Sequence, residues 1–155
     1  MMVVPTFVYG QPPRPLRVLV ADDNADATDS LAMLLKLAGC DVAVAYEGFA
    51  VVPVADRFRP DVCVLDIRMP GLDGWEIARR LRAGAGGAGL LLIAVTGVQG
   101  QPAADRSAGA GFDYHLLKPA HPADIFADLA AFIREAIVCP VGVGCPPSGG
   151  VRFAG

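Results

Sequence analysis

Residues 62–66 are the feature that most constrains how this chain can fold. The apolar run VCVL (62–65) ends on a carboxylate, Asp66, and the sequence Met-Pro-Gly follows at 69–71. A short apolar run bounded by turn residues is typical of a strand that is covered on both faces. Asp66 is therefore predicted to end a buried strand, at the edge where open α/β sheets hold their ligands.

The rest of the chain repeats this pattern with helical segments in between. Further strands are predicted at residues 16–21, 41–45, 90–95 and 112–117, and helices at 26–38, 47–58, 74–82, 102–110 and 122–138. Alternation of this kind indicates a parallel sheet with helices on both faces. We predict a doubly wound, flavodoxin-like α/β fold with five strands in the order 2-1-3-4-5 and five helices. Pro53 requires that the helix at 47–58 starts late or is kinked.

Length and charge limit the domain organisation and the partners. The chain has 155 residues, enough for one domain, which we place at residues 16–138 between an N-terminal tail (1–15) and a disordered Pro/Gly-rich tail (139–155). The net charge is −3 and basic residues are not clustered, so no nucleic-acid partner is expected. Apolar runs are too short for a membrane helix, and the first residues do not form a secretory signal, so a cytoplasmic location is expected.

Polar residues follow four of the five predicted strands. Asp22 and Asp23 follow the first, Asp66 the third, Thr96 the fourth and Lys118 the fifth. In the order 2-1-3-4-5 these four strands are successive neighbours, and their carboxyl ends meet at one crevice. The five side chains are therefore expected to converge.

The chemistry of this set favours a metal ion and a phosphoryl group. Three carboxylates in one crevice stay ionised together only around a cation. Oxygen donors suit Mg²⁺, with Mn²⁺ as an alternative, and Mg²⁺ commonly also binds phosphate oxygens. Lys118 and Thr96 would then contact phosphoryl oxygens, and Asp66 would be the nucleophile that forms an aspartyl phosphate.

At this point the sequence resembles the receiver domain of response regulators in two-component signalling. The matching segments are VLVADDN (18–24), VLDIRMPGLDGWEIARRLR (64–82), AVTG (94–97) and FDYHLLKPA (112–120). The resemblance covers roughly residues 16–137. The sequences of the last two segments are most similar to those of receivers carried on hybrid histidine kinases, or of their single-domain relatives.

The resemblance implies a role for each acidic residue. Asp66 resembles the phosphoacceptor, and Asp22 and Asp23 resemble the acidic pair that binds Mg²⁺. The backbone carbonyl of Arg68 resembles the third protein ligand of that ion. These residues would hold the metal and receive the phosphoryl group.

The resemblance also implies a conformational switch, with one departure. Thr96 resembles the switch hydroxyl and Lys118 the phosphate-binding lysine, followed by Pro119 in a cis peptide bond. The switch position that usually holds Tyr or Phe is His115, a residue type that titrates near neutral pH, while Tyr114 points to the opposite face of the strand.

The sequence therefore predicts a phosphoacceptor in a phosphorelay and not an enzyme, apart from its own Mg²⁺-dependent phosphorylation and dephosphorylation. Its expected partners are a histidine kinase or a histidine phosphotransfer protein and an unidentified downstream protein. We expect a monomer or weak dimer without an output domain of its own. We also expect slow autodephosphorylation, because Val98 does not help to position an attacking water.

Two other functions remain as alternatives. A Mg²⁺-dependent aspartyl-phosphate phosphatase would need a second aspartate two residues after the nucleophile, where Arg68 stands. An interaction domain that works without phosphorylation would share the fold but would not use the acidic site. A flavodoxin-like cofactor binder is disfavoured, because Asp22 and Asp23 would repel the cofactor phosphate.

Overall fold

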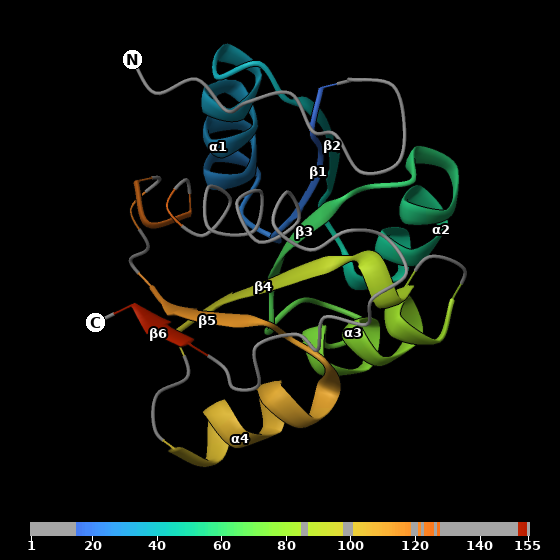
Figure 1. Cartoon of the computed structure of the whole chain (residues 1–155), viewed down its shortest axis with the longest axis vertical. Coiled ribbons are helices and arrows are strands. Elements are labelled where there is room, and N and C mark those ends of the chain that lie inside the picture. Colours follow the sequence, from blue (N-terminus) through green and yellow to red (C-terminus); the bar gives the residue numbers. More distant parts are fainter. Residues whose placement is uncertain are drawn as a thin grey trace, which may run out of the picture.

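The computed structural model describes residues 15–84, 87–97, 101–118, 121, 123–125, 127 and 152–154. Figure 1 shows a twisted sheet with helices on both sides. The strands are β1 (Arg17–Ala21), β2 (Asp41–Ala45), β3 (Val62–Asp66), β4 (Leu91–Thr96), β5 (Tyr114–Leu117) and β6 (Arg152–Ala154). The helices are α1 (Ala25–Leu37), α2 (Gly48–Phe58), α3 (Gly74–Ala83), the 3-10 turn η1 (Gly87–Gly89) and α4 (Gln101–Ala110).

The strand order is β2-β1-β3-β4-β5-β6, and every neighbouring pair is parallel. The predicted order of the first five strands is thus confirmed. The five predicted strands are all present, and a sixth strand that was not predicted, β6, pairs with β5 and extends the sheet. The same finding corrects the prediction of a disordered tail for residues 152–154, while 139–151 and 155 lie outside the described residues. Pairing with β6 satisfies backbone groups that an edge strand would leave unpaired.

Local signals set the ends of the helices. Asn24 caps α1 by accepting a hydrogen bond from the Ala27 N–H (3.1 Å), and Gly39 follows the helix with φ of 99°. Asp73 caps α3 in the same way through the Glu76 N–H (2.9 Å). Helix α2 starts at Gly48, so Pro53 lies within it and the proposed late start is wrong. Of the helix predicted at 122–138, residues 123–125 and 127 are helical and the rest lies outside the described residues.

The sheet separates two hydrophobic clusters. Leu19 and Leu65 belong to the cluster that includes residues of α2 and α3, whereas Val18 and Val64 belong to the cluster that includes Leu35 of α1. All four side chains are at most 3% exposed, as expected for central strands covered on both faces. Among the described residues, no helix combines the length and apolar character needed to cross a membrane.

Replacing Gly74 by alanine is expected to destabilise the fold at the strand end that carries Asp66. A Cβ at Gly74 would lie 2.7 Å from the Ile67 Cα and 2.8 Å from the Asp66 carbonyl oxygen, and backbone atoms cannot move away without shifting β3 or α3. We expect a loss of about 1–3 kcal/mol of unfolding free energy in urea denaturation. The control is Gly109→Ala in α4, where a Cβ meets nothing within 4 Å and should stabilise the helix by about 0.5–1 kcal/mol. Equal stabilities for the two variants would contradict this account.

Candidate functional site

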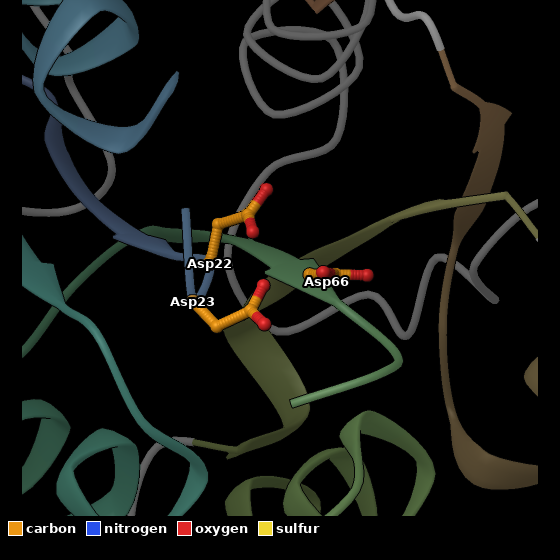
Figure 2. A group of neighbouring side chains, drawn as sticks. All are labelled: Asp22, Asp23 and Asp66. Carbon is orange, nitrogen blue, oxygen red and sulfur yellow. The ribbon is translucent and has the colours of Figure 1, made fainter. Parts of the chain in front are cut away.

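Three carboxylates gather at the carboxyl ends of β1 and β3. Asp22 and Asp23 directly follow β1, and Asp66 is the last residue of β3. Each offers an oxygen that lies within 4.8 Å of the other two, and Figure 2 shows the three side chains near one another at the strand ends. The predicted convergence of these three residues is therefore present in the structure.

Lys118 connects two of these carboxylates from the end of β5. Its Nζ donates to Asp66 Oδ2 at 3.0 Å and to Asp22 Oδ2 at 3.1 Å. The side chain of Asp66 is only 6% exposed, and its other oxygen accepts a hydrogen bond from the Arg68 N–H at 3.2 Å. Both oxygens of the buried carboxylate are thus held by donors, which fixes its orientation at the strand end.

The first turn of α1 positions the acidic pair. The Asn24 N–H donates to Asp22 Oδ1 at 3.0 Å. The buried hydroxyl of Thr28 lies 3.1 Å from the Asp22 carbonyl oxygen and 2.9 Å from that of Asn24, so it ties the helix to the loop. Thr28 was not predicted as a site residue. The only signal for it is that a threonine in a first helical turn can bond to the carbonyl four residues earlier.

Burial and charge act in opposite directions on these groups. Burial raises the pKa of the Asp66 carboxyl, the charge of Asp22 raises it further, and Lys118 opposes this without overcoming it. Burial also raises the pKa of Asp22, but hydrogen bonds from Asn24 and Lys118 outweigh it and the net pKa is lowered. The pKa of Lys118 is raised, because its bonds to Asp66 and Asp22 outweigh the effect of burial. One lysine thus faces an excess of carboxylates.

The donor set fits a hard divalent cation. Around Mg²⁺, oxygen ligands sit at about 2.0–2.1 Å from the ion, so neighbouring ligand oxygens lie roughly 3 Å apart and opposite ones roughly 4 Å. Oxygens of Asp22, Asp23 and Asp66 within 4.8 Å of one another need only small movements to share such an ion. The Arg68 backbone is at the site through its N–H, and a role for its carbonyl oxygen stays a prediction.

Thr96 and His115 lie on the next two strands. Thr96 ends β4, is fully buried, and its carbonyl accepts from the Lys118 N–H at 2.9 Å. His115 is 2% exposed and pairs with Ala94 of β4 in the sheet register. Tyr114 lies in the other hydrophobic cluster, on the opposite face as predicted. The predicted cis bond before Pro119 and the predicted role of Val98 lie outside the described residues.

This arrangement agrees with a comparison to known protein families. The model of the response regulator receiver domain matches residues 18–130. The chain belongs to the response-regulator receiver family. The receiver match contains all the site residues named above, from Asp22 to Lys118.

The curated relatives of this receiver are larger proteins. It is 38% identical over 121 residues to the transcriptional regulatory protein PrrA of Mycobacterium tuberculosis, a match that covers 77% of this chain and 50% of PrrA. It is 32% identical over 119 residues to the DNA-binding response regulator MtrA of Mycobacterium leprae, covering 77% of this chain and 52% of MtrA. The chain thus spans about half the length of the curated relatives it matches. The finer prediction of a hybrid-kinase or single-domain receiver stays a prediction.

Solved structures show the same fold. A CheY-like receiver domain protein from Methanospirillum hungatei superposes with a TM-score of 0.74 at 23% identity, covering 81% of this chain and 98% of that one. The chemotaxis response regulator CheY4 of Vibrio cholerae superposes with a TM-score of 0.72 at 23% identity, covering 77% and 99%. The five-stranded receiver fold predicted from the sequence is therefore shown, and β6 is added to it.

Replacing Lys118 by methionine is expected to tighten Mg²⁺ binding. Methionine keeps the length of the side chain but removes the only cation that bonds to Asp22 and Asp66 among the described residues. Without that charge the carboxylates attract a divalent ion more strongly, by about 1 kcal/mol, or roughly a fivefold lower dissociation constant. Calorimetric titration would measure it, with exposed Lys36→Met on α1 as the control. Weaker binding by the Lys118 variant would mean that the lysine orders the site more than it repels the ion.

Proposed function

We propose that this receiver accepts a phosphoryl group on Asp66 from a phosphohistidine of a histidine kinase or a histidine phosphotransfer protein. One observation carries the proposal. Lys118 Nζ bridges Asp66 and Asp22 at 3.0 and 3.1 Å, beside an acidic cluster that can hold a divalent cation. A nucleophile, a cation site and a phosphate-binding cation are thus adjacent.

The residues have separate tasks in the transfer. A carboxylate oxygen of Asp66 attacks the phosphorus, the P–N bond breaks, and its electron pair leaves with the donor imidazole. Lys118 exchanges a carboxylate partner for a phosphoryl oxygen, and the Arg68 N–H keeps the Asp66 carboxyl oriented. Mg²⁺, held by Asp22, Asp23 and Asp66, supplies positive charge for the phosphoryl oxygens when bound.

The proposed output is a change in protein binding. A phosphoryl group adds about −1.5 to −2 charges beside Thr96 and Lys118, at the ends of β4 and β5. We propose that this domain recognises a downstream protein as a monomer or weak dimer in the cytoplasm. A net charge of −3 is unfavourable for direct contact with nucleic acid. The alternative function of an aspartyl-phosphate phosphatase is disfavoured, because Arg68 stands where such an enzyme would need a second aspartate, two residues after Asp66.

Acetyl phosphate provides the test of this function. In the presence of Mg²⁺, intact mass spectrometry should show the gain of one phosphoryl group, and hydroxylamine should remove it, as expected for an acyl phosphate. EDTA should prevent the gain. A protein that gains no mass from acetyl phosphate or from a phosphorylated histidine phosphotransfer protein would instead support the phosphorylation-independent interaction domain.

A further inference from the structure

Three side chains from three elements meet beneath α4, away from the acidic cluster. The indole N–H of Trp75, at the start of α3, donates to Ser107 Oγ of α4 at 3.0 Å. The same oxygen lies 2.9 Å from Nδ1 of His115 on β5. Ser107 is fully buried and His115 is 2% exposed. One hydroxyl therefore joins α3 and α4 to the strand that precedes Lys118.

The Ser107 hydroxyl can form hydrogen bonds with Trp75 and His115 at the same time. An indole N–H can only donate, whereas a serine hydroxyl accepts and donates at once, and Nδ1 of a histidine can do either. Ser107 can thus accept from Trp75 and donate its own proton to His115, or accept from both. Because the site is buried, a movement of His115 that breaks its bond leaves a polar atom without immediate access to water. The side chains are expected to move together.

His115 lies close to the phosphorylation site within the sheet. His115 of β5 is opposite Ala94 of β4 in the sheet register. Thr96 lies two residues after Ala94 on β4. Residues two apart on a strand point to the same face, so Thr96 and His115 lie on the α3–α4 side of the sheet. A displacement of Thr96 would therefore disturb the packing on the α3–α4 side of the sheet, where the His115 ring lies.

Trp75 reaches the surface at the other end of this connection. Its ring is half-buried, and the guanidinium carbon of Arg106, which is exposed, lies 3.9 Å from the ring centroid. Arg106 is the residue before Ser107 in α4. A change in the Ser107 bonds therefore acts on half-buried Trp75 and, through its ring, on exposed Arg106.

We propose that Ser107 is a positioning residue that couples His115 to Trp75, so that phosphorylation of Asp66 changes the Trp75–Arg106 surface between α3 and α4. The inference rests on the proposed phosphoacceptor function and names the surface that this function controls. The surface suits a protein partner that offers an acidic group to Arg106 and an apolar group to Trp75.

Trp75 is the only tryptophan in the chain, so tryptophan fluorescence reports on the surroundings of this side chain alone. In wild type, emission should change on addition of Mg²⁺ and change again on addition of acetyl phosphate. Ser107→Ala should gain the same phosphoryl mass but lose the second change, and Ser107→Thr, which keeps the hydroxyl, should restore it. Ser30→Ala, an exposed serine on α1, is the matched control and should behave as wild type.

A measurement on the wild-type protein covers the case in which Ser107→Ala does not fold. The single indole N–H gives one proton–nitrogen resonance, whose exchange with water should be slow and should accelerate when Mg²⁺ and beryllium fluoride are added. Unchanged exchange, or a Ser107→Ala variant with a wild-type second emission change, overturns the coupling. Absence of phosphoryl mass gain in wild type would instead count against the proposed function, so the two failures are distinguishable.

Discussion

Asp66→Asn is expected to reduce phosphoryl incorporation from acetyl phosphate by about a thousandfold or more, because a carboxamide cannot attack phosphorus to form an acyl phosphate. The change is nearly isosteric. The asparagine oxygen can still accept from the Arg68 N–H, which lies 3.2 Å from Asp66 Oδ1. Intact mass spectrometry and peptide mapping would measure the loss.

Asp73→Asn is the matched control. Asp73 lies in the loop after β3 and caps α3, and asparagine caps helices as well as aspartate does. This variant should gain phosphoryl groups as wild type does. If Asp66→Asn were phosphorylated at the wild-type level, the acceptor would be another residue and the assignment of Asp66 would be wrong.

Asp66→Asn should also leave the protein without Mg²⁺ at least as stable as wild type. The pKa of Asp66 is raised in the fold, first by burial and then by the charge of Asp22, so ionised Asp66 is disfavoured in the native state. Its charge therefore lowers stability as the pH rises through the folded-state pKa, and an uncharged asparagine removes that loss. Thermal denaturation at neutral pH without Mg²⁺ would test this. A lower midpoint for Asp66→Asn would show that the bond to Lys118 outweighs the burial of the charge.

The position of the acidic cluster could be predicted because it depends on sheet topology. Asp22 and Asp66 follow strands that are recognisable from apolar runs, and parallel strands bring their carboxyl ends to the same edge. Lys118 could be placed there for the same reason, from the end of β5. The hydrogen bonds that orient these side chains, such as those of Lys118 and the Arg68 N–H to Asp66, could not be predicted from the pattern of apolar and polar residues.

Other features escaped prediction because they depend on contacts between distant segments. Ser107 lies in the helix predicted at 102–110, and the sequence suggested no role for it. In the structure Ala103, Ser107 and Ala110 are buried at helical spacing and form the face that α4 turns toward the core. Strand β6 has three residues in a Pro/Gly-rich tail, too few to show a strand period. Its position depends on the unpaired backbone groups that β5 offers at the edge of the sheet, and its own sequence does not indicate it.

Arg82 is the clearest case of such a distant contact. Its guanidinium bonds to the carbonyl oxygens of Gly111 (2.9 and 2.7 Å), Gly87 (2.7 Å) and Leu90, and to Asp113 Oδ2 at 2.7 Å. The same Asp113 oxygen accepts from the Leu92 N–H at 2.9 Å. One side chain therefore ties the end of α3 to the starts of β4 and β5.

Arg82→Ala is expected to lower the free energy of unfolding by about 3 kcal/mol, which corresponds to a fall in melting temperature of roughly 6–12 °C. The Arg82 and Asp113 side chains are each 23% exposed, so removing the guanidinium leaves partly buried acceptors that water reaches poorly. Urea denaturation would measure the loss. Arg82→Lys should recover only part of it, because an ammonium cannot reproduce the planar arrangement of donors.

Arg80→Ala on the same helix separates this effect from the loss of a surface charge. Arg80 is 53% exposed and pairs with Glu76 at 3.3 Å, so its loss should cost less than about 0.5 kcal/mol. If the two alanine variants were equally stable, the Arg82 bonds would add nothing beyond an exposed ion pair. A large difference would show that the anchoring of the starts of β4 and β5, the strands that lead to Thr96 and Lys118, depends on a residue outside the phosphorylation site.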